Sequence, residues 1–168
     1  MLWLGHPAHM SLIYRGSSQG INPAAFHAKC DKKGPTLTLL KSEHGKVFGG
    51  FTSVSWRSHS KPKCVKDPRA FIFSLDKQER FDIKHVNGSA VVHFKEYMPV
   101  FGRDTLRDIF IQRNESRKPN NNTHDLGSNY RLPRSMVIGS KICREFLSGT
   151  DLLFKLEEIE VYSVLYSS

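Results

Sequence analysis

The chain has 168 residues, 39% of them hydrophobic and 11% aromatic, which is enough to bury the core of one globular domain and argues against a disordered chain. Its 25 Lys and Arg residues outnumber 16 Asp and Glu residues, giving a net charge of +9. This excess attracts acidic partners, which include proteins, nucleic acid and anionic lipid. The basic residues are scattered and show neither zinc-finger spacing nor a long basic helix, so nucleic-acid binding is only a minor alternative.

The cysteine pattern indicates a reducing compartment, and we expect one domain that begins after the first ten residues. Cys30, Cys64 and Cys143 form an odd set without a CxxC pair, which argues against a disulfide framework or zinc site and favours reduced thiols in the cytosol or nucleus. No apolar run reaches the roughly 20 residues of a membrane span. Residues 1–10 are too short in their apolar part for a secretory signal. We set them aside as a terminal extension, native or left by cloning, and expect one domain over residues 11–168.

The first third of the chain predicts a strand at 11–14, a helix at 23–30 and strands at 36–41 and 47–56. Asn22 is a good N-cap, and Pro23 suits the first helical position because it lacks an N–H group. Apolar residues on both faces of 47–56 predict a central strand. Gly49-Gly50 within it indicates either a bulge or a close approach of another backbone. A phosphate-binding loop is the alternative, but no Lys-Ser/Thr or helix follows the pair.

Short strands and turns alternate through the rest of the chain. A basic loop is expected at 57–68, strands at 70–75, 81–85, 89–94, 106–112 and 152–162, an edge strand at 126–133, and a helical turn at 141–147. Asn87-Gly88 predicts a hairpin between the second and third of these strands. Phe71, Phe73 and Leu75 alternate toward the interior. The pattern predicts a mostly β (α+β) fold, an antiparallel sandwich or barrel flanked by a few short helices.

The last predicted strand contains an irregularity that can be placed from the sequence. Phe154 and Leu156 have one parity, whereas Ile159 and Val161 have the other. A β-bulge at Glu157-Glu158 would return both pairs to one face of the sheet.

Two groups of residues are candidates for catalysis, and each has a structural alternative. Cys30 could be a reactive thiol whose pKa is lowered by nearby lysines, or a small buried residue at a helix end. Glu157, Glu158 and Glu160 could serve acid–base or hydrolytic chemistry, or could form a solvated strand face. The eight histidines lack the HExxH and HxxxH spacings, so neither a metal nor a cofactor is expected.

Five segments together resemble the TLDc domain family of oxidation-resistance proteins. They are Leu12–Arg15, Phe26–Leu39, Val47–Trp56, Asp67–Leu75 and Phe154–Val161, in family order. The resemblance implies a globular β-sandwich flanked by short helices and protection against oxidative stress. It also implies, from several relatives, binding to the vacuolar proton pump (V-ATPase), and it implies no enzymatic activity. The expected partner is therefore a protein, with V-ATPase subunits as candidates. The expected location is the cytoplasm, at the surface of acidic organelles or in mitochondria.

The resemblance weakens in the third quarter of the chain. The family usually has Phe-Gly-Gly-Gly-His-Asp where this chain has Phe101-Gly102-Arg103-Asp104-Thr105-Leu106-Arg107-Asp108. The family's Leu-Gly-His-Ser-Tyr is replaced by Leu126-Gly127-Ser128-Asn129-Tyr130. A family function that depends on those glycines or histidines is not carried over to this chain.

Partner binding is expected on loops that a rigid sandwich holds in place, here 57–66, 103–107 and 113–125. The candidate contact residues are Arg57, Lys61, Lys63, Lys66, Arg103, Arg107, Arg113, Arg117 and Lys118. The family-motif residues assigned to fold integrity are Cys30, Gly34, Pro35, Gly49, Gly50, Trp56, Gly102, Glu158 and Glu160.

Overall fold

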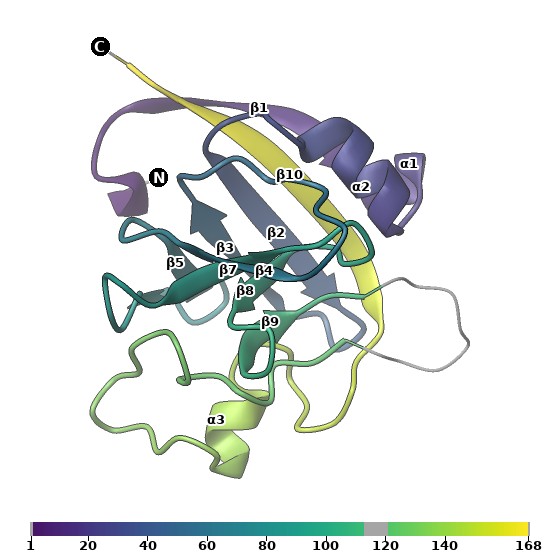
Figure 1. The fold of residues 1–168 in the computed structure, drawn as a ribbon. Helices are drawn as coiled ribbons and strands as arrows, with labels where there is room; N and C mark the ends of the chain where they lie inside the picture. Colours follow the sequence, from purple (N-terminus) through teal and green to yellow (C-terminus); the bar gives the residue numbers. More distant parts are fainter. Residues whose placement is uncertain (1, 113–120, 168) are drawn as a thin grey trace.

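The computed structural model describes residues 2–112 and 121–167, which form two antiparallel sheets packed face to face (Figure 1). The strand order is β1-β10-β2-β3-β5-β6 in one sheet and β4-β7-β8-β9 in the other. The six strands of the larger sheet are β1 (Ala8–Arg15), β10 (Leu156–Tyr166), β2 (Thr36–Ser42), β3 (Val47–Thr52), β5 (Phe71–Ser74) and β6 (Glu79–Asp82). The smaller sheet contains β4 (Lys63–Lys66), β7 (Ser89–His93), β8 (Val100–Gly102) and β9 (Arg107–Phe110). The predicted fold class is confirmed.

The helices lie at the two ends of the sandwich. A short 3₁₀ turn, η1 (Leu2–Leu4), precedes β1, and α1 (Gly16–Gln19) and α2 (Pro23–Cys30) lie beside β1 and β10, whereas α3 (Lys141–Glu145) lies at the opposite end (Figure 1). The predicted cap of α2 is present, because the Asn22 side chain accepts a hydrogen bond from Ala25 N at 2.9 Å.

Strand β3 is central in the larger sheet, as predicted, and most of its residues are buried. A side chain at Gly49 would place its Cβ atom 1.9 Å from the Thr38 carbonyl oxygen of β2, and one at Gly50 would meet the Phe101 ring of β8 at 2.5 Å. The close approach is confirmed, but the pairing of both glycines is regular, so the bulge is not present. The strand also ends at Thr52, four residues earlier than predicted.

The main core lies between the sheets and is built by both of them. It includes the four apolar residues on either side of the predicted bulge, which are Phe154, Leu156, Ile159 and Val161. The register of β10 against β2 shifts between Leu156 and Glu158, which confirms the predicted bulge. The extra residue restores the apolar parity that the straight strand would lose.

A second core covers the other face of the larger sheet and corrects two expectations. Phe71 and Phe73 belong to this outer cluster, and Ile72 between them faces the main core. The N-terminal segment packs on the same face, with the Trp3 ring 5.5 Å from that of Phe73 and Leu4 buried. Residues 8–10 also extend β1, so the segment 1–10 that we set aside takes part in the fold.

The predicted hairpin around Asn87-Gly88 is wrong. The turn exists, since Gly88 N donates to His85 O at 2.8 Å, but β6 pairs with β5 and β7 pairs with β4 and β8. The turn therefore carries the chain from one sheet to the other. Local turn chemistry does not specify this choice, because it depends on which sheet buries each strand.

The predicted edge strand at 126–133 is replaced by a loop that a buried carboxylate holds. Only Tyr130 forms a β-bridge there, with Ile83. Asp108 accepts hydrogen bonds from Gly127 N at 2.8 Å, Asn129 Nδ2 at 2.7 Å and Asn129 N at 3.0 Å. Burial raises the pKa of Asp108 to about 7, while these donors act in the opposite direction. The Asp108 carboxylate thus satisfies backbone N–H groups at the start of the loop, while Asn129 O and Arg131 N pair with the backbone of Lys84 and Asp82.

Candidate functional site

The basic segment expected to be a loop at 57–68 contains strand β4, at the edge of the smaller sheet. β4 pairs with β7 alone, with Lys63 opposite His93 and Val65 opposite Val91. Val65 packs against the main core, while Lys63, Cys64 and Lys66 are exposed. A short edge strand can pack on the core with a single inward apolar side chain, here Val65. The other residues of β4 are exposed, so the sequence shows no strand pattern and we predicted a loop.

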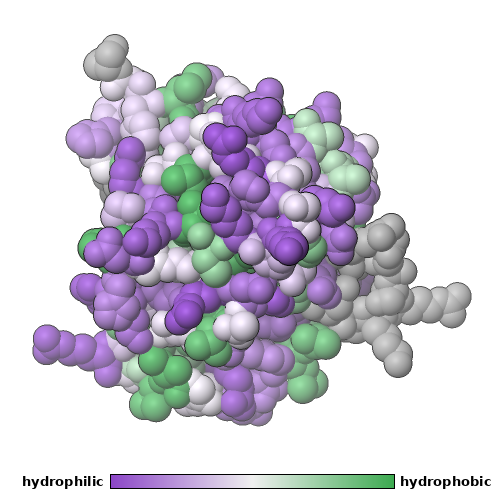
Figure 2. All heavy atoms as spheres, viewed as in Figure 1, coloured by the Kyte–Doolittle hydropathy of each residue, from purple (hydrophilic) through white to green (hydrophobic). Residues whose placement is uncertain are grey.

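Most of the candidate contact residues gather at this edge. Arg57, Lys61, Lys63, Lys66 and Arg103 are all exposed, and among the described residues no carboxylate oxygen lies within 4.0 Å of their charged nitrogens. Hydrophilic side chains cover most of the face in Figure 2, and hydrophobic ones form small separate patches. The edge therefore presents positive charge to solvent, and no described carboxylate within the fold neutralises it.

A hollow of about 570 Å³ lies on the outer face beside β4. Cys64 and Lys66 of β4 line it together with His85 and Arg103. These residues are far apart in sequence, so the smaller sheet brings the predicted loops 57–66 and 103–107 to one site. The described residues that line it include no acidic side chain.

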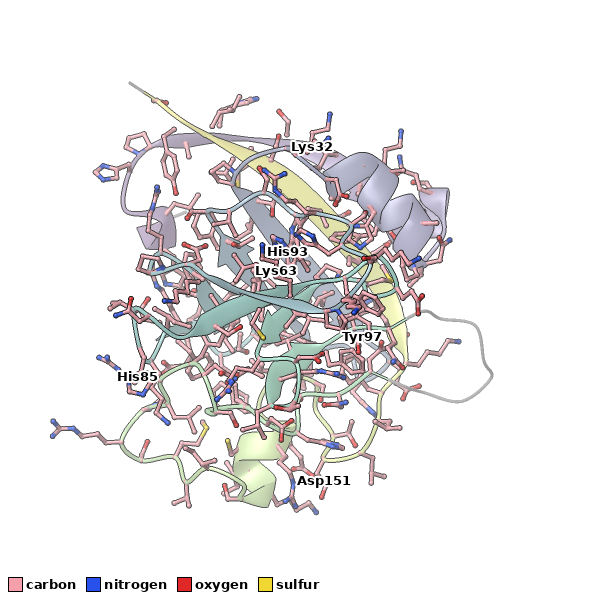
Figure 3. The ribbon with its side chains drawn as sticks, viewed as in Figure 1. Lys32, Lys63, His85, His93, Tyr97 and Asp151 are labelled. Carbon is pink, nitrogen blue, oxygen red and sulfur yellow. The ribbon has the colours of Figure 1, made fainter. Side chains whose placement is uncertain are left out.

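A second hollow, of about 370 Å³, lies at the mouth of the sandwich on the inner face of β4. Val54 and Val65 supply apolar surface, and Arg57 and Lys63 supply charge. His93, which lies beside Lys63 in Figure 3, completes the wall with His59. Again no acidic side chain is among the described lining residues.

His93 is the residue of this site that sequence reasoning missed. It is 3% exposed, its ring stacks on that of His59 at 6.0 Å, and its Nε2 atom is buried with no hydrogen-bond partner among the described residues. Burial, followed by the charge of His59, lowers its pKa to about 4, so the ring is neutral at neutral pH. Its only sequence signal was a place in an apolar strand, which is shared by many structural histidines.

Arg107 has a different role from the other candidate cations. Its guanidinium pairs with Asp104 at 3.3 Å, donates to Tyr97 Oη at 3.2 Å and lies 4.0 Å from the centre of the Phe110 ring. These contacts fix the loop before β9, so Arg107 is committed to the fold. Arg113, Arg117 and Lys118 lie outside the described residues.

The family-motif residues occupy structural positions in the described fold. Trp56 is buried and donates from Nε1 to Thr36 Oγ1 at 2.9 Å. Gly34 N donates to Ser55 Oγ at 3.0 Å, Pro35 O accepts from Val164 N, and Gly102 has a φ of +120° at the end of β8. These contacts join the end of α2, the start of β2 and the segment after β3.

Cys30 is fully buried at the end of α2. Burial and, to a lesser extent, the charge of Asp31 raise the pKa of the thiol, and Lys33 only partly opposes them. The hypothesis of a lowered pKa at Cys30 therefore has the wrong sign, and the position fits the small buried residue that was the structural alternative.

The three glutamates of β10 do not converge on one point. Glu157 pairs with Lys41 at 3.4 Å, while Glu160 pairs with Arg15 at 2.7 Å and accepts from Tyr162 Oη. Glu158 accepts from Ser17 N and Ile159 N. Burial alone would raise its pKa, but the side chain and backbone of Ser17, the Ile159 N–H group and the charge of Arg15 together outweigh burial and lower it. A lowered pKa is opposite to that of a general acid.

The described residues, 2–112 and 121–167, offer neither a cluster of metal ligands nor a helix that could cross a membrane. No group of three or more His, Cys, Asp or Glu side chains is arranged to hold a metal ion there. The helices of these ranges also lack the length and apolar composition that crossing a bilayer requires.

Comparison with protein families decides the identity of the fold. The family model described as the TLDc domain matches residues 6–165, nearly the whole chain. The chain belongs to the TLDc domain family. The TLDc match begins before residue 11 and so includes strand β1.

Among curated proteins, the chain is similar to the MTOR-associated protein MEAK7 of three vertebrates. It is 35% identical over 71 residues to the Danio rerio protein, 33% over 70 residues to that of Mus musculus, and 36% over 74 residues to that of Xenopus laevis. Each match covers 42% of this chain and 15% of the relative. The chain thus corresponds to a small part of these relatives.

Proposed function

We propose that this TLDc domain is a non-catalytic protein-interaction module. The observation that carries the proposal is the match of the TLDc family over residues 6–165, since the resemblance at sequence level implied protein binding and no reaction. The exposed cations at the β4 edge support it, because charges without internal partners on a rigid scaffold are available to a partner.

The finer proposal is that the partner is the vacuolar proton pump and that binding contributes to protection against oxidative stress. The domain would then act in the cytoplasm, at the surface of acidic organelles or in mitochondria. The relatives are named as MTOR-associated, so an mTOR-containing assembly is a second candidate partner. Both candidates are protein assemblies, and both are compatible with a basic contact surface.

Affinity capture tests this function. The full chain, tagged and expressed in its own cells, is used as bait under gentle lysis, and V-ATPase and mTOR subunits are scored by quantitative mass spectrometry. Recovery of pump subunits above a bait of equal net charge supports the first candidate, and recovery of mTOR alone supports the second. Absence of both contradicts the proposed partners.

The matched control is a charge-reversed pair at the site, Lys63→Glu with Lys66→Glu. Capture that survives this double substitution would place the contact elsewhere on the domain. A second pair, Lys29→Glu with Lys155→Glu, changes the net charge equally at exposed positions away from β4.

A further inference from the structure

Among the described strands, β4 is the sheet edge that combines an open backbone edge with cations that have no described carboxylate partner. The edge strand β9 is continued by Asn122, which exchanges backbone hydrogen bonds with Phe110 at 3.0 and 3.1 Å. The edge strand β6 is followed by Arg131, whose N–H donates to Asp82 O at 2.8 Å. In β1 the one Lys or Arg side chain, Arg15, is paired with Glu160. No such continuation borders β4 among the described residues.

The two hollows lie on opposite faces of this edge. Cys64 and Lys66 line the outer hollow, and Lys63 and Val65 line the inner one. This alternation follows the pleat of β4, because successive side chains of a strand point to opposite faces. A strand added in the plane of the sheet would have the same alternation and would direct its own side chains into the two hollows in turn.

We propose that the open edge of β4 binds an extended acidic peptide segment by strand addition. The inference rests on the proposed protein-binding function and names the chemistry of the partner segment. Main-chain hydrogen bonds to β4 supply the register over about 13 Å of strand, and acidic side chains reach the cations of both faces.

The composition of the hollows selects the side chains of this segment. On the inner face, Val54 and Val65 offer apolar contact next to Arg57 and Lys63, and the unpartnered Nε2 of His93 lies in the same wall. A glutamate can bury its methylene groups there and place its carboxylate by the cations. On the outer face, Lys66 and Arg103 flank a larger hollow with room for a second glutamate side chain.

The same charges explain why the edge stays open. Lysines on an edge strand prevent two copies of a protein from pairing with each other, since both strands would be positive. They do not oppose an acidic strand, which is attracted instead. The positive charge of β4 thus opposes pairing with the same strand of a second copy and favours pairing with an acidic strand.

A binding experiment with defined probes tests the proposal. The probes are a peptide of about eight residues with the repeat Glu-Glu-Val-Val, which places glutamate and valine on both faces of an extended strand, its lysine–valine counterpart, and the glutamate–valine peptide N-methylated at every residue. Titration at low salt should show binding of the first probe alone. The N-methylated peptide keeps the charge and the side chains but cannot pair as a strand, so its equal binding would overturn strand addition.

Three further readouts complete the test. Lys63→Glu with Lys66→Glu should weaken peptide binding about tenfold or more, whereas Lys29→Glu with Lys155→Glu should keep most of it. Backbone amides of residues 63–66 should gain protection from hydrogen exchange on binding. Tighter binding of a single-stranded oligonucleotide of equal charge, or no peptide binding, would overturn the proposal.

The two proposals fail in different ways. If pump or mTOR subunits are captured but the glutamate–valine peptide does not bind, strand addition at β4 is wrong and the partner contact lies elsewhere. If the peptide binds and neither assembly is captured, the binding edge stands and the proposed partners are wrong.

Discussion

Strands β3 and β4 lie close together in the sequence but have opposite roles. β3 is central, its glycines touch a neighbouring backbone and an aromatic ring of the other sheet, and most of its side chains are buried. β4 is at an edge, contributes mainly Val65 to the core, and exposes cations without described carboxylate partners. The difference shows that stability and binding are assigned to different strands. Substitutions in β3 should therefore lower the stability of the domain strongly, and substitutions of the exposed lysines of β4 should change it little.

The largest effect is expected from Gly49→Ala. The new Cβ atom would lie 1.9 Å from the Thr38 carbonyl oxygen, so the backbone of two central strands must move. We expect a loss of roughly 3 kcal/mol or more in the free energy of unfolding, measured by urea denaturation. Gly45→Ala is the control: it has a φ of +70° but open space around its Cβ position, so it should cost only about 1 kcal/mol. Equal losses in the two variants would contradict the close approach at β3.

We expect the free energy of unfolding to depend on pH through His93, which is buried in β7 opposite Lys63 of β4. Its pKa is about 4 in the folded state, below the ordinary value of 6.5. Below pH 6.5 the unfolded chain binds a proton that the folded chain does not, so stability falls as the pH drops from about 6.5 to about 4. The contribution lost is at most about 3 kcal/mol.

Urea denaturation at several pH values measures this contribution as the difference between the wild type and His93→Gln. The raised pKa of Asp108 acts in the opposite direction, because it makes stability fall with rising pH between about 4 and about 7. Both proteins contain Asp108, so its contribution cancels in the difference and the contribution of His93 remains. A His93→Gln variant with the same pH dependence as the wild type would show that His93 titrates normally.

A smaller effect is expected at Trp56, in the segment after β3, whose ring lies 5.6 Å from the ring of His93 in β7. Trp56→Phe keeps most of the aromatic contacts with Phe26 and Phe101 but removes the hydrogen bond to Thr36 Oγ1. The expected loss is about 2 kcal/mol, because a buried hydroxyl loses its donor and the ring volume falls. Thermal unfolding followed by circular dichroism measures it. Trp3→Phe in the outer cluster is the control. A larger loss of stability in that variant would mean that the outer cluster contributes more to stability than the main core.

The smallest effect on stability is expected from Lys63→Glu with Lys66→Glu. Neither side chain has a carboxylate partner among the described residues, so the free energy of unfolding should change by no more than about 0.5 kcal/mol. The same pair should lose peptide binding, which separates the binding strand from the strands that hold the fold. A large loss of stability in this variant would mean that β4 is part of the core and not a docking edge.

Local patterns in the sequence were sufficient for several elements. The cap and first turn of α2, the central position of β3 and the bulge before Ile159 follow from residue types within a few positions of each other. Each depends on capping chemistry or on the parity of apolar side chains, both of which act over short distances. The family-motif segments could be matched in the same way.

Tertiary structure alone decided which segments meet. It placed β6 and β7 in different sheets despite a strong turn signal, and it made an edge strand of the lysine-rich loop. It also brought Arg103 beside Lys66 and His93 beside Lys63, while it assigned Arg107 to the fold. These outcomes depend on which faces are buried against distant partners, a quantity that composition and spacing do not contain. The sequence determined the TLDc fold and its excess of positive charge, and the packing of two sheets decided where that charge is available.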